Sequence, residues 1–213
     1  MQDLIEIRGV SKSFGTASVL KDVTVSFAEG AIHGIVGRNG SGKTVLFKCL
    51  CGLMPYDTGE IAVRGEVVGR DTEMPRDFGA IIENPGFLPH YSGYKNLKFL
   101  ADLTGHAGRD DIRKAITLVG LDPDSKKHVR KYSLGMRQRL AIAQAIMESP
   151  SLFILDEPLS GLDKRGLAEM RELFLSYRDL GRTMLIASHS TEDIDVLCDT
   201  VHEMDEGRLT RVR

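Results

Sequence analysis

The octapeptide GRNGSGKT, Gly37 to Thr44, has the spacing of glycine, lysine and threonine that a loop needs to hold the phosphates of a nucleotide. Glycines let backbone N–H groups face phosphate oxygens without side-chain clashes, and a helix that starts near Lys43 adds the favourable dipole of its N-terminus. Lys43 is expected to contact the β- and γ-phosphates, and Thr44 to ligate Mg²⁺. The other residues expected around the phosphates are Gly37, Arg38, Asn39, Gly40, Ser41 and Gly42.

Two adjacent carboxylates, Asp156 and Glu157, end the apolar run LFILDEP. Acidic residues at the end of a strand are often only solvated, but a magnesium ion bound by Thr44 needs a carboxylate nearby. We therefore expect Asp156 to ligate Mg²⁺. Glu157 is expected to act as the general base that takes a proton from the water attacking the γ-phosphate.

A histidine, His189, follows another apolar run, TMLIAS. Its imidazole is predicted to contact the γ-phosphate and to hold the attacking water. The simpler alternative is a histidine of the surface or of the core that takes no part in the chemistry.

The segment KYSLGMRQRL, Lys131 to Leu140, carries no reactive pair of its own. Ser133 is predicted to cap the helix that follows, and the start of that helix, with Ser133 and Gly135, also suits an anion. This segment is predicted to lie away from the phosphate loop of its own chain. We therefore expect it to close over the nucleotide of a partner subunit.

Strands and helices must bring these residues together. Apolar patterning predicts a helix at 43–53 and helices throughout 84–147, and strands and helices alternate again from 148 onward. Strands are predicted in the first part at 4–10, 19–27, 31–37, 59–65 and 78–83. We predict a single α/β domain with a P-loop NTPase core of mostly parallel sheet (1–83 and 148–213), an antiparallel edge of N-terminal strands, and an inserted helical lobe (84–147).

The composition limits the possible partners and location. The 213 residues carry a net charge of −2 at pH 7, which argues against a general affinity for nucleic acid. The first residues, MQDLIEIRGV, lack the pattern of a secretion signal, and no window reaches the ~18 apolar residues of a membrane span. We expect a cytosolic or peripheral protein whose three cysteines are small buried side chains.

Taken together, these segments resemble the ATP-binding subunits of ABC transporters over essentially the whole chain. GRNGSGKT is similar to the Walker A motif and LFILDEP to Walker B. SGLD, Ser160 to Asp163, resembles the D-loop, YSLGMRQR the signature loop, and His189 the switch histidine. The motifs follow one another in the order of the family.

The resemblance implies a Mg²⁺-dependent ATPase that dimerises around two ATP molecules, most simply as a homodimer. It places Ser133 and Gly135 against the γ-phosphate of the opposite subunit, adds Asp163 to the nucleotide site, and stacks Phe14 on adenine. Without the resemblance, Phe14 would be interpreted as a core aromatic at a strand end. The implied location is cytoplasmic, on the inner face of the cell membrane, where the second partner is an integral membrane permease subunit; no nucleic acid is expected.

Three positions depart from the wider family. Leu134 and Met136 replace a glycine and a glutamine of the signature, and Glu83 follows FGAII where a glutamine is usual. Similar segments are typical of the bacitracin-export and lantibiotic-immunity branch, so the resemblance points to export of a peptide antibiotic or bacteriocin. As a Mg²⁺ ligand Glu83 is expected to approach the site when Mg²⁺–ATP binds. The alternative is a solvated acid at a strand end.

Two other functions stay open. A soluble ABC-type ATPase that acts on ribosomes or DNA usually has two cassettes or a long coiled-coil insertion, which this sequence lacks. A nucleotide switch or small-molecule kinase would not need the signature loop, the D-loop and Glu157. The apolar segment Asn84–Phe99 either receives the membrane partner or packs down onto the helices.

Overall fold

The computed structural model describes residues 3–83 and 86–213. Its strands are β1 (Asp3–Phe14), β2 (Ala17–Ala28), β3 (Ile32–Val36), β4 (Thr58–Val63), β5 (Glu66–Val67), β6 (Phe78–Ile81), β7 (Leu152–Asp156), β8 (Thr183–Ala187), β9 (Thr200–Asp205) and β10 (Arg208–Arg211). Its helices are α1 (Lys43–Leu50), α2 (Gly93–Thr104), α3 (Arg109–Leu118), α4 (Leu134–Ile146), α5 (Lys164–Asp179) and α6 (Thr191–Leu197), with a 3₁₀ turn at Val129–Lys131.

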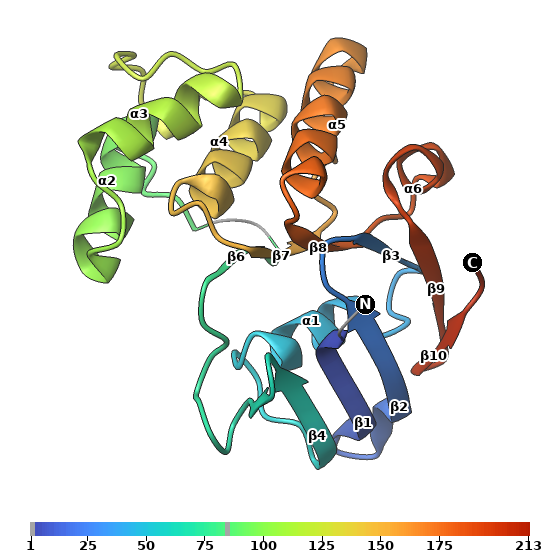
Figure 1. Ribbon diagram of the computed structural model, residues 1–213. Coiled ribbons are helices and arrows are strands. Elements are labelled where there is room, and N and C mark those ends of the chain that lie inside the picture. Colours follow the sequence, from blue (N-terminus) through green and yellow to red (C-terminus); the bar gives the residue numbers. More distant parts are fainter. Residues whose placement is uncertain (1–2, 84–85) are drawn as a thin grey trace.

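Two sheets form the frame of the molecule (Figure 1). The six-stranded sheet has the order β10-β9-β3-β8-β7-β6, and its neighbours are parallel except in the β9–β10 hairpin. The N-terminal strands expected at an antiparallel edge pair with one another in a separate sheet, β2-β1-β4-β5. The predicted α/β class with a mostly parallel sheet is confirmed.

The parallel strands face a different core on each side. In β7, Phe153 and Leu155 pack toward the helices α2–α6, whereas Leu152 and Ile154 pack toward α1 and the antiparallel sheet, with Phe47 of α1 between the sheets. Successive side chains of a strand point to opposite faces. Both faces are therefore covered, which explains why these strands are continuously apolar rather than alternating.

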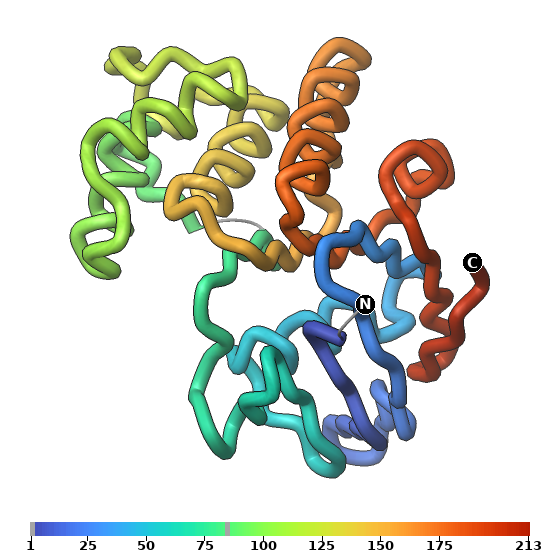
Figure 2. Tube along the Cα trace, in the orientation of Figure 1, coloured from blue at the N-terminus to red at the C-terminus, as the bar shows by residue number. Residues whose placement is uncertain are grey.

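Three helices separate two strands that are neighbours in space. The chain leaves the sheet after β6, forms α2, α3 and α4, and returns to β7 (Figure 2). β7 pairs directly with β6, with Phe78 opposite Leu152. The long excursion therefore leaves the sheet unbroken, and α4 packs against β6 on the way back.

Some predicted boundaries were wrong. The first helix ends at Leu50 rather than Leu53, because Gly52 has φ +73° and a Cβ there would lie 1.9 Å from the carbonyl oxygen of Glu73. The last apolar stretch is a hairpin of two strands. Cys49, Cys51 and Cys198 are free and buried, as predicted.

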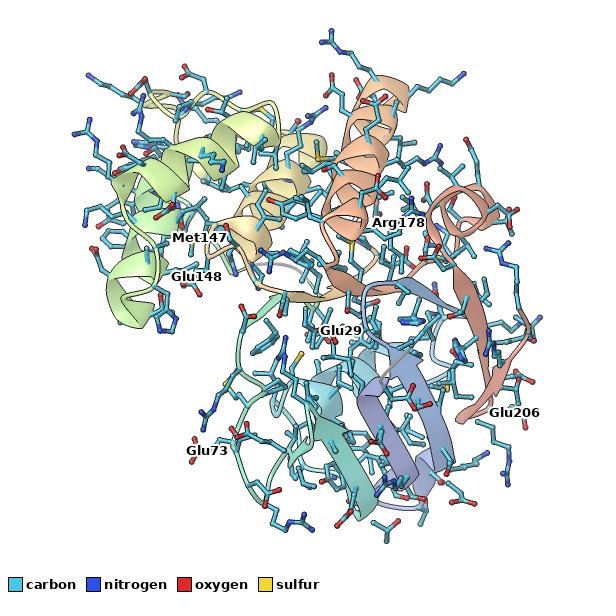
Figure 3. All side chains as sticks on the ribbon, in the orientation of Figure 1. Glu29, Glu73, Met147, Glu148, Arg178 and Glu206 are labelled. Carbon is cyan, nitrogen blue, oxygen red and sulfur yellow. The ribbon has the colours of Figure 1, made fainter. Side chains whose placement is uncertain are left out.

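The surface is rich in charge. Charged side chains extend outward from every part of the fold, among them the labelled Glu29, Glu73 and Glu206 (Figure 3). None of the helices in the described ranges combines the length and the apolar character that crossing a membrane requires.

Two buried histidines of the six-stranded sheet, His33 in β3 and His202 in β9, lie beside Phe27 of β2. The ring centroids of His33 and His202 are 5.2 and 5.1 Å from that of Phe27. His33 pairs through Nδ1 with Thr200 Oγ1 and through Nε2 with the carbonyl of Ala28, whereas the buried Nδ1 of His202 has no partner among the described residues. Burial lowers the pKa of His33 and lowers that of His202 to about 4.

We predict that these histidines make the protein less stable in mild acid. Their folded pKa values lie below the unfolded value of 6.5, so the unfolded chain takes up these protons more readily than the folded chain as the pH falls below 6.5. For His202 this difference extends down to about pH 4. His202 should remove on the order of 3 kcal/mol from the free energy of unfolding across that window.

The measurement is urea unfolding at neutral pH and near pH 4.5. His202→Leu should lose less stability between the two than the parent does, because one protonation is removed. The matched control is His90→Leu, at an exposed histidine outside the core, which should leave the pH dependence unchanged. Equal pH dependence of the His202 variant and the parent would contradict the prediction.

Candidate functional site

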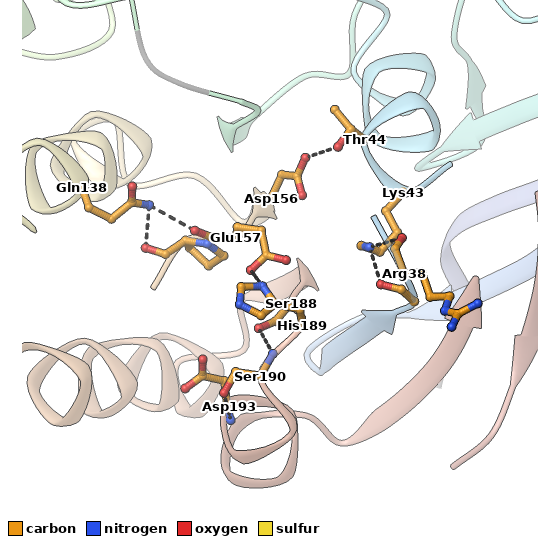
Figure 4. A network of polar contacts seen from close by, with 12 residues as sticks. Arg38, Lys43, Thr44, Gln138, Asp156, Glu157, Ser188, His189, Ser190 and Asp193 are labelled. Carbon is orange, nitrogen blue, oxygen red and sulfur yellow. Dashed lines mark hydrogen bonds and ion pairs between the residues drawn. The ribbon is translucent and has the colours of Figure 1, made fainter. Parts of the chain in front are cut away.

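The loop between β3 and α1 is shaped by glycines. Gly37, Gly40 and Gly42 have φ of +148°, +80° and +115°, and a Cβ on Gly42 would lie 2.9 Å from the carbonyl oxygen of Val19. Side chains at these positions would be strained or would close the loop. The Lys43 amino group donates to the carbonyls of Gly37 at 2.6 Å and Arg38 at 3.1 Å (Figure 4).

A hydrogen bond connects the start of α1 to the end of β7. Thr44 Oγ1 donates to Asp156 Oδ2 at 2.5 Å. The two oxygen-bearing side chains predicted to ligate one metal ion therefore lie side by side, although 112 residues separate them in the chain.

Glu157 and His189 meet at the ends of β7 and β8. The Glu157 N–H donates to the carbonyl of Ala187, and Glu157 Oε2 lies 2.8 Å from His189 Nδ1 (Figure 4). Glu157 has φ +50°, a left-handed conformation that a residue other than glycine adopts at a cost and that is frequent at functional sites. The carboxylate is thus turned out of the strand direction and held by an imidazole.

A side chain that the sequence analysis missed fixes the same turn. Gln138, in the second turn of α4, donates its amide to the carbonyls of Pro158 at 2.7 Å and Glu157 at 3.3 Å. It lies five residues after Ser133 in the predicted anion-binding segment. Helix α4 therefore touches the backbone of the proposed base directly.

These elements surround a cavity of about 640 Å³, which is within the range of small-molecule sites. It is lined by Val19, Asn39, Gly40, Gly42, Lys43, Thr44, Val45, Glu83, Leu134, Gln138, Asp156, Glu157 and Ser160. The cavity brings together the phosphate loop, both carboxylates of the Asp-Glu pair and Glu83. His189 reaches it only through Glu157.

Glu83 follows β6 with a left-handed φ of +58°, and its carboxylate pairs with Lys48 Nζ at 2.6 Å. Lys48 lies four residues after Thr44, so the helical period puts both on the same face of α1. That spacing was visible in the sequence and could have revealed the partner. The positive charge of Lys48 offsets the additional carboxylate.

Two predicted residues act as helix caps. Ser133 Oγ accepts from the N–H of Met136 at 3.1 Å, which confirms the predicted cap, and Asp163 Oδ1 accepts from the N–H of Gly166 at 2.8 Å at the start of α5. Both are outside the cavity lining, as is Gly135, where a Cβ would lie 3.1 Å from the Gly161 carbonyl.

The start of α4 lies closer to the phosphate loop of its own chain than expected. Leu134, next to Ser133, lines the cavity together with Gln138. The expectation that this segment stands apart from its own cradle therefore holds for Ser133 but not for the helix as a whole.

Phe14 is the last residue of β1 and is 48% exposed, with Lys12 Nζ 5.6 Å from its ring centroid. The alternative interpretation as a core aromatic is therefore wrong. Phe14 is not part of the cavity lining. Among the lining residues, Val19 of β2 comes from the antiparallel sheet.

The residues present fit a nucleotide with Mg²⁺. Ser41 has a buried hydroxyl inside the loop with no partner among the residues described. No cluster of three or more His, Cys, Asp or Glu suited to a metal occurs within residues 3–83 and 86–213. Mg²⁺ needs no such cluster, because it takes one or two protein oxygens together with phosphate oxygens and water. Thr44 and Asp156 supply such oxygens.

Comparison with known proteins settles the family, since residues 20–160 match the family model of the ABC transporter. The chain belongs to the ABC transporter ATP-binding proteins. It is therefore an ABC ATPase, and the family predicted from the motifs is confirmed.

The relatives cover nearly the whole ABC ATPase chain. It is 41% identical over 206 residues to the ABC transporter ATP-binding protein YybJ of Bacillus subtilis (strain 168), covering 97% of this chain and 94% of YybJ. It is 38% identical to the bacitracin transport ATP-binding protein BcrA of Enterococcus faecalis, covering 98% of this chain and 68% of BcrA. The lantibiotic transport ATP-binding protein SrtF of Streptococcus pyogenes is 35% identical, and the alignment covers 97% of this chain and 89% of SrtF.

Solved structures agree on the fold. A nucleotide-free ATP-binding cassette from an ABC transporter superposes with a TM-score of 0.86 at 20% identity, covering all of this chain and 92% of the other. A dimeric ATP-binding cassette in a post-hydrolysis state with ADP and Pi superposes with a TM-score of 0.85 at 18% identity. The superposition covers 98% of this chain and 99% of the other.

The β9–β10 turn supports the phosphate loop of the ABC ATPase from behind. Gly207 donates its N–H to the carbonyl of Ser41 at 3.2 Å and accepts from the N–H of Lys21 at 2.8 Å. A Cβ on Gly207, which has φ +84°, would lie 2.4 Å from the carbonyl oxygen of Val19. The turn thus joins β2 to the loop at a contact that only glycine allows.

We predict that Gly207→Ala lowers the affinity for ATP about tenfold (about 1.4 kcal/mol), because relieving the collision with Val19 displaces the N–H that holds the Ser41 carbonyl. Fluorescence titration with a labelled ATP analogue measures it. Gly65→Ala is the matched control: Gly65 has φ +79° and open space where a Cβ would stand, so it carries the same backbone strain, about 1–2 kcal/mol, without the collision. Equal affinities for the two variants would refute the supporting role of the turn.

Proposed function

We propose that this ABC ATPase is the Mg²⁺-dependent energy-supplying subunit of a membrane transporter. Two copies would close around two ATP molecules, and hydrolysis would drive a separate integral membrane permease. The observation that carries the proposal is the convergence of Lys43, Thr44, Asp156, Glu157 and Glu83 on one cavity of nucleotide size.

The chain's own residues divide the work at the triphosphate. Backbone N–H groups of the loop Gly37–Thr44 and the Lys43 amino group bind phosphate oxygens, and Asn39 extends from the loop into the same cavity. Mg²⁺, held by Thr44 and Asp156 with Glu83 nearby, would supply positive charge to the β- and γ-phosphates. Arg38, the second residue of this loop, adds a further cation.

Glu157 takes the proton of the attacking water. The water oxygen bonds to the γ-phosphorus while the bond from that phosphorus to the β-γ bridging oxygen breaks, and ADP and phosphate leave. His189, 2.8 Å from Glu157 Oε2, holds the carboxylate in the orientation that faces the cavity. Gln138 fixes the backbone that carries it.

The second copy completes each site. Ser133 is exposed at the start of α4, where unpaired N–H groups favour an anion. We assign Ser133 and Gly135 to the γ-phosphate held by the other subunit. Asp163 follows Gly161, which packs on Leu134, so the D-loop and the signature loop present one joint surface. Phe14, exposed at the end of β1, is assigned to the adenine ring.

The membrane permease is proposed to dock beside the start of α2. Of the predicted docking segment, Asn84 and Pro85 lie outside the described residues. Leu88 and Tyr91 are 46% and 40% exposed and available to a partner, whereas Phe87 and Tyr94 pack against the core. Part of the segment is therefore free to receive the permease, and part of it packs onto the helices.

The proposed cargo is a peptide antibiotic or bacteriocin, moved outward, and the proposed place of work is the inner face of the cell membrane. Two of the relatives carry bacitracin and lantibiotic transport in their names. The cargo itself would be selected by the permease.

We predict that Glu157→Gln binds ATP like the parent but hydrolyses it at least about 100-fold more slowly, because an amide does not accept the proton of the water. Phosphate release measures the rate of hydrolysis. Size exclusion in the presence of ATP measures binding, because ATP-bound dimers should accumulate. Glu29→Gln, at an acid on the turn after β2, is the control and should hydrolyse normally. A Glu157→Gln variant with parental turnover would remove this residue from the role of base.

We further predict that mixing two inactive variants restores ATPase activity. If Ser133 serves the partner's nucleotide, a dimer of Lys43→Ala with Ser133→Ala collects both defects in one site and leaves the other site whole. Phosphate release by the mixture should exceed that of either variant alone. Should both residues serve the same chain's nucleotide, no mixture would contain an intact site.

Two controls accompany the mixing experiment. A chain carrying both substitutions, mixed with the parent, should lower the activity, because each site of the mixed dimer then holds one defect. Ser92→Ala removes an equivalent cap, that of α2, and should leave hydrolysis intact. No gain in a mixture with demonstrated subunit exchange would refute the assignment of Ser133 to the partner's site.

A further inference from the structure

The charge of this protein is divided between two parts of the chain. Residues 84–147 contain eleven lysines and arginines and five aspartates, a net charge of +6. The rest of the chain contains 17 basic and 25 acidic residues, a net charge of −8. A near-neutral total therefore conceals a strongly basic helical segment, and such asymmetry indicates a partner with fixed negative charge.

Five of the eleven basic side chains line a groove on the helical segment. The groove has a volume of about 370 Å³ and is lined by Ser92, Tyr94, Lys95, Lys98, Arg109, Arg113, Pro123, Asp124, Ser125 and Lys126. Five cations thus face one carboxylate, and Asp124 already accepts two hydrogen bonds from Arg113, both at 2.7 Å. The remaining polar groups can all donate, because lysine, arginine, serine and tyrosine carry N–H or O–H groups.

Three of these cations are uncommitted. Lys98 pairs with Asp102, and Arg113 with Asp124. Lys95, Arg109 and Lys126 make no ion pair with any described residue, and Lys95 Nζ lies 5.9 Å from the ring centroid of Tyr91. Their charge is available to a ligand.

An apolar stripe runs beside the groove. Tyr91, Lys95, Phe99 and Leu103 follow one another at intervals of four, so they share one face of α2 and the turn before it. Phe99 is 41% and Leu103 83% exposed, and the Tyr91 and Phe99 rings meet edge to face at 5.1 Å. Exposed aromatic and aliphatic groups interleaved with lysines are the composition of helices that lie at a membrane surface.

We infer that the groove binds the phosphate of an anionic lipid headgroup, with Phe99 and Leu103 of the α2 stripe resting against the acyl region of the same leaflet. A phosphodiester offers only acceptors, which matches a lining of donors. An acidic protein segment would bring backbone N–H groups that need acceptors, and the one carboxylate of the groove, Asp124, is already occupied by Arg113. The contact involves neither ATP nor Glu157, so it stands apart from the proposed catalytic function.

The test is flotation of the full chain with lipid vesicles, without nucleotide. The parent should bind vesicles of phosphatidylcholine mixed with phosphatidylglycerol, bind pure phosphatidylcholine poorly, and release as salt screens the charges. The variant Lys95→Gln, Arg109→Gln, Lys126→Gln should bind the anionic vesicles on the order of 100-fold more weakly, at about one kcal/mol per charge.

The matched control removes three charges from the antiparallel sheet and its flank instead. Arg8, Arg70 and Arg76 have side chains that are 67%, 61% and 77% exposed, and replacing them with Gln changes the net charge equally. This variant should float like the parent. ATPase activity without vesicles should be parental in both variants, so a failure of the lipid proposal is distinguishable from a failure of the catalytic one.

A soluble competitor separates the sources of phosphate. Glycerol phosphate should displace the protein only at concentrations far above those of the lipid, because it lacks the apolar contact. Leu103→Ser should weaken binding several-fold without altering its salt dependence. The proposal is overturned if the parent ignores anionic vesicles, if the groove variant floats like the parent, or if an acidic peptide alone binds the groove.

Discussion

The site depends on one constraint: the carboxyl ends of parallel strands lie at the same edge of a sheet. The order β3-β8-β7-β6 brings the phosphate loop, His189, Glu157 and Glu83 to that edge from four separate stretches of chain. The hydrogen bond of Thr44 with Asp156 then connects α1 to β7, across the intervening β8. Any change that shifted the register of one strand by one residue would turn its terminal carboxylate away from the cavity.

The gathering of the phosphate loop and the carboxylates at one cavity could be predicted because these residues are few and belong to local motifs. GRNGSGKT needs only a strand before it and a helix after it, and both are present. Ser133 could likewise be predicted as a helix cap, because the capping hydrogen bond joins residues only three positions apart. Lys48 beside Glu83 was missed although the helical spacing from Thr44 pointed to it.

What escaped prediction rests on contacts between distant segments. The N-terminal strands form their own sheet because α1 fills the space between them and the parallel strands, and no local pattern encodes that layer. The amide of Gln138 reaches the carbonyl of Pro158, and Gly207 reaches Ser41, by tertiary packing alone. In the same way α4 carries Ser133 at its start and holds the backbone of Glu157 one turn further on. A single helix therefore links the surface proposed to face a partner with the proposed base of its own site.

Glu83 gives the site one more negative charge than the glutamine that is usual at this position in the family. Three carboxylates, Glu83, Asp156 and Glu157, line one cavity that must also receive a triphosphate, and like charges in such a space repel. Lys48 reduces that repulsion by pairing with Glu83 at 2.6 Å. Under the proposed function, Mg²⁺ bound with the nucleotide would give Glu83 a second cationic partner, and exchanging Lys48 for the metal would leave the charge of Glu83 compensated. A neutral amide has no comparable attraction to either partner, so the carboxylate would make the position of this strand end depend on the metal.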